Sequence, residues 1–291
     1  MSDGRISVTP QVALVVGAAG QLGSAFAADL LDEYAVVGHT RQTLDVTNHA
    51  AVLEAVANAR PAVIVNCAAF NDVDGAEDDP VTAFSVNAFA VRSLARAAKQ
   101  AGAVLVHYST DFVFSGDTDR PYTEDDRPSP QSVYAQSKLV GEWMAADAPR
   151  HYVLRVESLF GGPHGRSSID RIIHALRTGG EAKVFSDRYV SPSFVEDVVR
   201  ATRALIRANA APGLYHCVNS GFGTWLEVGE EIARLLGSPT DRLVPVLTSE
   251  VALKAPRPRF AALEAKRLTQ QGIVMPGWQH AVRRHLVSVN G

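Results

Sequence analysis

Short apolar runs alternate with segments of helical periodicity through the first half of the chain, and this alternation constrains the fold most. The first run, QVALVVG (11–17), is nearly continuous, as expected for a strand buried on both faces. Further strands are predicted over 35–40, 61–69, 103–110 and 151–158, with helices over 21–34, 50–60, 80–102 and 129–147. Repeated strand–helix units predict an α/β fold: a Rossmann-like parallel sheet with helices on both faces.

The ends of two predicted helices carry capping residues. Gly102 is a C-cap candidate for the helix over 80–102, because glycine adopts the left-handed conformation that ends many helices. Ser129 is the expected N-cap of the next helix, with Pro130 at its first position. The second half is less regular, with helices predicted over 167–180, 193–210 and 224–237 and a strand over 213–219.

The composition excludes several functional classes. Of 291 residues, 46% are hydrophobic and 20% are charged, which fits a compact protein. A net charge of −3 without a basic run argues against a nucleic-acid partner. Two cysteines, and nine histidines without ligand spacing, predict no metal site. No segment is long enough to span a bilayer and the N-terminus lacks a signal-peptide pattern, so we expect no membrane partner and a cytoplasmic location.

A glycine-rich segment, GAAGQLG (17–23), joins the first strand to the first helix. Glycine lets the backbone turn sharply and approach a pyrophosphate, while the N–H groups of the helix N-terminus face the negative charge. The sequence therefore predicts that a dinucleotide binds at Gly17, Gly20, Gln21, Leu22 and Gly23.

The end of the second strand bears on the choice of dinucleotide. An NAD site usually has an acidic residue here for the ribose hydroxyl, but this chain offers His39, Thr40 and Arg41. The planar guanidinium of Arg41 can pair with a 2′-phosphate, which favours NADP, with NAD as the alternative. A solvated loop arginine is the competing interpretation.

Other residues are expected beside the cofactor. Asp45 and Val46 follow the second strand and are placed to flank the adenine. At the end of the third strand, Cys67, Ala68 and Ala69 are small enough for a cofactor to lie against the backbone, although core packing explains each of them equally well. Cys67 is expected to be a small buried side chain rather than a nucleophile.

The segment SVYAQSK (132–138) places Tyr134 four residues before Lys138, on one face of a predicted helix. The spacing alone is weak, but Thr110 follows the fourth strand and reaches the same edge of the sheet. We expect Lys138 to lower the pKa of Tyr134 towards neutrality, so that this phenol can exchange a proton with a carbinol oxygen held by Thr110. A nicotinamide would supply or accept the hydride.

Together these features resemble the extended short-chain dehydrogenase/reductases and, among them, the dTDP-4-dehydrorhamnose reductase family. The resemblance covers nearly the whole chain and includes GAAGQLG, LDVTN, RPAVIVNCAAF, VHYSTDFVFSG, PSPQSVYAQSKLVGE and SDRYVSPSFVEDV. It implies an NADPH-dependent reductase of a 4-keto-6-deoxy nucleotide sugar, with Thr110, Tyr134 and Lys138 as the catalytic residues. By the same resemblance, Tyr134 and Lys138 also lie at the cofactor, where Lys138 holds the nicotinamide ribose.

The resemblance also implies a substrate side, and here the chain departs from the family. Asp111 is expected to face the sugar nucleotide and Arg257 to lie near it. Phe112 replaces a tyrosine of the family, Ser158 stands where a tryptophan is expected, and Asn71 stands where threonine is common. We therefore expect a different sugar or weak turnover, and we leave a homodimer open.

Two other functions remain open at this point. The regulatory β subunit of methionine adenosyltransferase resembles the same family, binds NADP without catalysis, and is compatible with the same three residues. A nucleotide-sugar epimerase or dehydratase ranks lowest, because the turn after the fourth strand offers only Asp111 as an acid.

These predictions divide the chain into an NADP-binding Rossmann domain over 1–160 and a mostly substrate-binding lobe over 161–291, with some segments returning to the Rossmann sheet. The tryptophans at 143, 225 and 278 are expected to pack in the core or the lobe, and TEDDRP (123–128) to be a solvated loop. Glu157 is unusual at the end of a buried strand, because a carboxylate there needs a partner.

Overall fold

The computed structural model describes residues 10–289, so the first nine residues of the N-terminus, where no signal-peptide pattern is found, lie outside the described residues. A six-stranded parallel sheet forms its centre, in the order β10-β5-β4-β3-β1-β2. The strands are β1 (Val12–Val16), β2 (Ala35–His39), β3 (Val63–Asn66), β4 (Val104–Thr110), β5 (His151–Val156) and β10 (Gly213–His216). Because the chain reverses its direction of travel across the sheet between β1 and β3, a ligand crevice is expected there.

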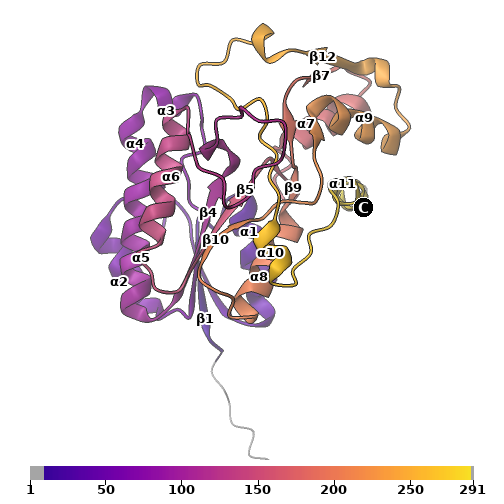
Figure 1. Cartoon of the computed structure of the whole chain (residues 1–291). Coiled ribbons are helices and arrows are strands. Elements are labelled where there is room, and N and C mark those ends of the chain that lie inside the picture. The colour runs from indigo at the N-terminus through magenta and orange to yellow at the C-terminus, as the bar shows by residue number, and fades with distance from the viewer. Residues whose placement is uncertain (1–9, 290–291) are drawn as a thin grey trace, which may run out of the picture.

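Helices cover both faces of this sheet (Figure 1). On one face, α1 (Gln21–Asp29) and α8 (Val195–Arg207) pack Phe26 and Val198 against strand residues such as Val106. The other face is covered by α2 (His49–Ala59), α5 (Ala90–Ala101) and α6 (Val133–Ala145). The predicted α/β fold with a parallel sheet and two helical layers is therefore confirmed.

A second hydrophobic core lies beyond the carboxyl ends of the strands, in the lobe drawn at the upper right of Figure 1. It contains Trp225 and Trp278, which confirms the packing expected for both. Its elements are α7 (Ser168–Arg177), α9 (Trp225–Leu236), α11 (Trp278–Ser288) and the strand pairs β7 (Ala182–Phe185) with β12 (Leu243–Val246), β8 (Tyr189–Val190) with β11 (Gly223–Thr224), and β6 (Leu159–Phe160) with β9 (Ser193–Phe194).

The helix expected over 80–102 is interrupted. It consists of α4 (Pro80–Phe84), a π-helical turn η2 (Ser85–Phe89), and α5, which ends at Gly102 with a left-handed φ of 67° as predicted. The π-helical turn presents the Asn87 side chain to the segment after β3: its Nδ2 donates to the Phe70 carbonyl and its Oδ1 accepts from the Phe70 N–H, both at 2.9 Å. Short π-helical turns are frequent at functional sites.

The helix that carries Tyr134 begins later than predicted. Its N-cap is Ser132, whose Oγ accepts a hydrogen bond from the Ala135 N–H at 3.2 Å. The predicted cap, Ser129, lies in the preceding loop, where its own N–H donates to the Val113 carbonyl at 2.8 Å, and Pro130 precedes the helix.

The expected packing of Trp143 is also wrong, because this side chain is 63% exposed on α6.

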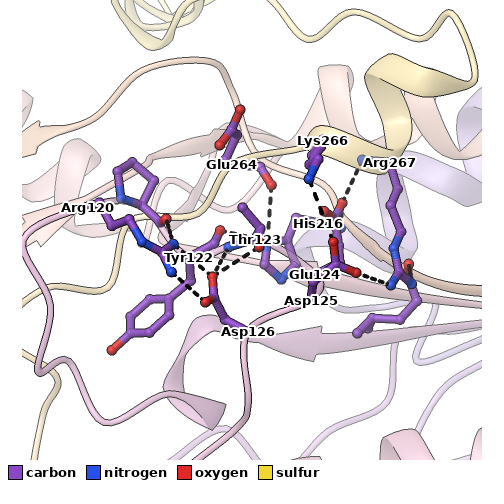
Figure 2. Close-up of polar contacts among 12 residues, drawn as sticks. Arg120, Tyr122, Thr123, Glu124, Asp125, Asp126, His216, Glu264, Lys266 and Arg267 are labelled. Carbon is purple, nitrogen blue, oxygen red and sulfur yellow. Dashed lines mark hydrogen bonds and ion pairs between the residues drawn. The ribbon is translucent and has the colours of Figure 1, made fainter.

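The segment predicted as a solvated loop is partly buried. Glu124 accepts hydrogen bonds at Oε1 from the backbone N–H groups of His216 (3.0 Å) and Arg267 (3.1 Å), as Figure 2 shows. It thereby ties the β4–α6 connection to β10 and to α10 (Lys266–Gln270).

The remaining short elements are α3 (Gly75–Asp78) and the 3-10 turns η1 (Leu30–Asp32), η3 (Asp111–Val113), η4 (Thr240–Arg242) and η5 (Thr248–Glu250). Within residues 10–289, no helix has the length and apolar character needed to cross a membrane.

Candidate active site

The strand register brings the predicted site segments to one edge of the sheet. Val16 of β1 pairs with Asn66 of β3, and Thr110 of β4 pairs with Val156 of β5. All of these strands are parallel, so the residues that follow them leave the sheet on the same side. The glycine turn, the Cys67 segment, Asp111 and Glu157 therefore lie at this edge.

The glycine turn has the shape of a cradle for a diphosphate. Gly17 has φ +80°, and a Cβ added there would lie 2.8 Å from the Ala68 nitrogen; a Cβ on Gly23 would lie 2.1 Å from the Gly17 carbonyl oxygen. Larger side chains are therefore excluded from both positions. Gly20 is the N-cap of α1, and no side chain in the described part of the chain caps this end, which leaves its N–H groups for an anion.

Gln21 and Leu22 have different surroundings within the same turn. Leu22 is buried in the core between the sheet and α1. The Gln21 side chain instead crosses to the segment after β5, where its Nε2 donates to the Gly161 carbonyl at 2.9 Å. His164 makes a second link from this segment, with its Nε2 2.9 Å from the Ala19 carbonyl oxygen. The glycine turn is thus held against the segment that leads into the lobe.

The loop after β2 presents Arg41 on the surface. Asp45 accepts hydrogen bonds from the Thr47 N–H at 2.9 Å and from the Thr47 hydroxyl at 2.7 Å. The Thr47 hydrogen bonds, aided by the Arg41 charge, hold the pKa of Asp45 below its usual range. Val46 is half-buried against the core behind β1. An exposed guanidinium on this loop fits the predicted interaction with a 2′-phosphate.

The segment after β3 carries small side chains, as predicted. Cys67 and Ala68 are half-buried and Ala69 is exposed. Low-dielectric surroundings raise the pKa of the Cys67 thiol, so the thiolate that a nucleophile requires is disfavoured.

A cavity of about 870 Å³ lies where this edge of the sheet meets the lobe. Its sheet side is lined by Gln21, Thr110, Asp111, Phe112, Tyr134, Glu157 and Ser158. The lobe contributes Arg166, Arg171, Lys183 and Arg188, and Asn71 and Arg257 also line the cavity. The predicted Thr110 and Tyr134 and all five predicted substrate residues therefore meet in one cavity.

Tyr134 lies between a hydroxyl and an aromatic ring. Its ring meets Phe112 edge to face, with the centroids 5.9 Å apart. Thr110 donates from Oγ1 to Asp111 Oδ1 at 2.9 Å. Burial, followed by the Asp111 charge, raises the pKa of Tyr134 to about 12, and hydrogen bonding with the Thr110 side chain opposes this rise.

The expected effect of Lys138 on Tyr134 is therefore wrong: the pKa of Tyr134 is raised, not lowered. Lys138 is only 3% exposed, and its Nζ donates a hydrogen bond to the Tyr108 carbonyl. Burial lowers the pKa of Lys138 itself to about 8. Desolvation and the Asp111 charge therefore decide the pKa of Tyr134, while the Lys138 ammonium binds the Tyr108 carbonyl.

Two carboxyl groups face the same part of the cavity. Burial raises the pKa of Asp111 to about 7. Burial and the neighbouring Asp111 raise the pKa of Glu157 well above its usual range. Arg188 lines the cavity as well, and its guanidinium lies 5.2 Å from the centroid of the Phe185 ring.

The remaining predicted substrate residues lie around this region. Arg257 forms an ion pair with Asp74 at 3.0 Å, and its guanidinium lies 6.0 Å from the centroid of the Phe112 ring. Ser158 adopts a left-handed φ of 44°, which few non-glycine residues do and which re-aims the chain as it leaves β5. Asn71 is exposed at the cavity lining.

Comparison with known proteins places this site in a family. A model of the family described as RmlD substrate binding domain matches residues 11–290. The chain belongs to the dTDP-4-dehydrorhamnose reductase family. A relative from Streptomyces griseus, named dTDP-4-dehydrorhamnose reductase, is 37% identical over 268 residues, which cover 89% of this chain and 88% of the relative.

Two further members of the family agree with this assignment. A relative from Streptomyces antibioticus, named probable dTDP-4,6-dihydroxy-2-methyloxan-3-one 4-ketoreductase, is 36% identical over 93% of this chain and 92% of its own length. The crystal structure of dTDP-4-dehydrorhamnose reductase from Bacillus anthracis in complex with NADP has a TM-score of 0.91 and 30% identity, covering 96% of this chain and 99% of that chain.

In this family member, sequence reasoning missed the buried charges that hold the Tyr134 helix. Arg155 of β5 binds Glu142 of α6 through two hydrogen bonds, at 2.8 and 2.7 Å, and Ser109 donates to the same carboxylate at 2.6 Å. The signal was present: an arginine inside an apolar strand, and a glutamate four residues after Lys138. Asn87 was missed as well; its Nδ2 donates to the Ser137 hydroxyl at 2.9 Å.

Among residues 10–289, no cluster of three or more His, Cys, Asp or Glu side chains has the arrangement of a metal site.

Proposed function

We propose that this chain is an NADPH-dependent reductase of a 4-keto-6-deoxy nucleotide sugar, of the dTDP-4-dehydrorhamnose type. The observation that carries the proposal is the single cavity in which Thr110 and Tyr134 meet cationic side chains of the lobe, beside Gln21 of the glycine turn. The family membership supports it, because relatives across the family are named as reductases of dTDP-linked ketones.

The dinucleotide would be held by the turn over Gly17, Gly20 and Gly23, whose shape excludes side chains, and by the uncapped end of α1. Arg41 would pair with the 2′-phosphate, which favours NADP over NAD, and the related crystal structure contains NADP. Lys138 would hold the nicotinamide ribose. When bound, NADPH supplies the hydride to the carbonyl carbon.

The substrate would lie along the cavity between the sheet and the lobe. Arg166, Arg171 and Lys183 give the lobe side a positive wall, which suits the diphosphate of a nucleotide sugar. The sugar would lie at the other side, against the predicted substrate residues Asn71, Asp111, Phe112, Ser158 and Arg257.

Tyr134 is the proposed general acid. A pKa of about 12 keeps its phenol protonated at neutral pH, so the proton needed for reduction is present. Thr110 would hold the carbonyl oxygen as that oxygen takes the proton from Tyr134 and becomes the alcohol. The side chain of Tyr134 is left as a phenolate, which solvent protonates before the next turnover.

The catalytic, cofactor-binding and substrate-binding roles given to the site residues stay predictions. The domain boundary near residue 160, the homodimer and the cytoplasmic location stay predictions as well.

The test is NADPH consumption with dTDP-4-dehydrorhamnose as substrate and purified protein as catalyst. We expect turnover with NADPH to exceed turnover with NADH, and Tyr134→Phe to lower kcat by about 10²- to 10⁴-fold, the usual contribution of general acid catalysis. Tyr215→Phe is the matched control, because within residues 10–289 the Tyr215 hydroxyl binds only the Ala211 carbonyl, at 2.7 Å. Full activity of Tyr134→Phe would contradict the mechanism. Absence of turnover together with tight binding to a methionine adenosyltransferase would favour the regulatory function.

A further inference from the structure

Glu157 is a buried carboxyl group with half of its hydrogen-bonding capacity unused. It directly follows β5 and is 2% exposed. Its Oε2 accepts from the Ser191 N–H at 2.6 Å, while its Oε1 has no hydrogen-bond partner among residues 10–289. A polar atom left unpaired in a buried position costs stability, so a partner supplied from outside the chain is expected.

The position of Glu157 indicates where that partner would come from. The residue lines the large cavity together with Tyr134 and Asp111. Thr110 pairs with Val156 in the sheet, so Asp111 and Glu157 are the first residues beyond this pair on adjacent parallel strands. The Asp111 charge raises the pKa of both Tyr134 and Glu157, while the charge of Arg188 acts to lower the pKa of both carboxyl groups.

We propose that Glu157 is a specificity-determining residue that, together with Asp111, binds a hydroxyl group on the sugar ring next to the carbonyl protonated by Tyr134. This inference rests on the proposed function. It adds a residue and a substrate group that the predicted substrate set did not include. The hydroxyl is that of ring carbon 3, because the other neighbour of the carbonyl carries the methyl group.

The chemistry of the two carboxyl groups suits a hydroxyl. Glu157 is the more strongly shifted towards the protonated form, so it has a proton to donate from Oε1. Asp111 is then available as an acceptor. A hydroxyl group both donates and accepts hydrogen bonds. It can therefore accept a hydrogen bond from protonated Glu157 while it donates one to Asp111. A hydrogen atom in its place would leave Oε1 of Glu157 without a hydrogen-bond partner and would remove one donor from Asp111.

The name of one relative fits this assignment. The 4,6-dihydroxy-2-methyloxan-3-one named for the Streptomyces antibioticus relative carries a hydroxyl on the carbon next to its ketone, and a methyl on the other neighbour. dTDP-4-dehydrorhamnose shares both groups. A hydroxyl beside the ketone is therefore common to substrates named in the family, and Glu157 is placed to recognise it in this chain.

The experiment compares dTDP-4-dehydrorhamnose with its 3-deoxy analogue in the wild type, Glu157→Gln and Glu157→Leu. The amide of Gln can accept from the Ser191 N–H and still donate from the Oε1 position; Leu can do neither. We expect the wild type to prefer the hydroxylated substrate by ~10- to 100-fold in kcat/KM. Glu157→Gln should keep this ratio within about 3-fold, and Glu157→Leu should lower it at least ~5-fold.

An equal loss for both substrates in Glu157→Leu would overturn the inference, since Glu157 would then only hold the Ser191 loop. An equal fall in the preference for the hydroxylated substrate in Glu157→Gln and Glu157→Leu would also overturn the inference. A second measurement separates this inference from the proposed function: dissociation constants of dTDP-rhamnose and its 3-deoxy analogue, measured by calorimetry with NADP⁺ present. The same ratios are expected there even if no NADPH is consumed, and a wild type that shows no preference overturns the inference.

Discussion

Asp111 and Tyr134 show that burial, rather than the neighbouring lysine, dominates the electrostatics of this site. The sequence correctly predicts that Thr110, Asp111 and Tyr134 reach one edge of the sheet, because strand order and helix spacing are enough for that. The direction of the Tyr134 pKa shift could not be predicted in the same way. It depends on the desolvation of both groups, which only the packed lobe and sheet produce.

The raised pKa of Asp111 predicts a pH-dependent stability. Its folded-state pKa of about 7 lies above the unfolded value, so between about pH 4 and pH 7 the folded state holds a proton that the unfolded state has released. The stability that this proton on Asp111 contributes to the folded state is fully present below the unfolded pKa, and it is lost as the pH rises through 7. As the pH is raised from 5 to 8, the free energy of unfolding of Asp111→Asn should therefore rise relative to that of the wild type by on the order of 2 kcal/mol.

Urea denaturation of both proteins at pH 5 and pH 8 measures this difference. The exposed Asp241→Asn is the control, and its stability should follow that of the wild type at both pH values. Parallel pH profiles for Asp111→Asn and the wild type would show that Asp111 does not hold a proton in the folded protein.

At the scale of elements, α6 is the part whose placement matters most, because it carries both Tyr134 and Lys138. The sequence predicts its existence but places its start at Ser129, since serine suits an N-cap at either position. The hydrogen bond from the Ser129 N–H to Val113 and the cap made by Ser132 decide between the two serines. The π-helical turn was missed because its apolar spacing does not differ from that of the helix around it.

The buried pair of Glu142 and Arg155 predicts a large cost for removing one partner. Glu142→Ala leaves the Arg155 guanidinium, 2% exposed, without its carboxylate, and we expect a loss of roughly 3–5 kcal/mol in the free energy of unfolding. Glu231→Ala is the matched control: its partner Arg234 is exposed on α9, so about 0–1 kcal/mol is expected.

A double variant separates the pair from simple loss of packing. Glu142→Leu combined with Arg155→Met removes both charges and keeps much of the volume, so it should recover a large part of the loss seen in Glu142→Ala. Chemical denaturation measures all four proteins. A cost below about 1 kcal/mol for Glu142→Ala would contradict the structural role assigned to this pair.

At the scale of the whole molecule, the cavity depends on contacts that the sequence does not reveal. Its sheet side follows from the order of the strands and was predictable. The lobe side was not, because Arg188 and Lys183 come from loops and short strands without a periodic pattern. Glu124 illustrates the same limit: its segment is highly charged, yet its carboxylate is buried and accepts hydrogen bonds from His216 and Arg267, which Figure 2 draws.

Hydride transfer into this cavity is the central claim, and isotope transfer tests it most directly. The protein is incubated with dTDP-4-dehydrorhamnose and NADPH that carries deuterium at nicotinamide carbon 4, and the product is examined by mass spectrometry and NMR. Separate reactions with each of the two deuterated epimers should give one epimer that transfers a single deuterium to sugar carbon 4, and Tyr134→Phe should transfer almost none. Absence of deuterium from the sugar with both epimers, under conditions where the protein binds the dinucleotide, would contradict the proposed reductase.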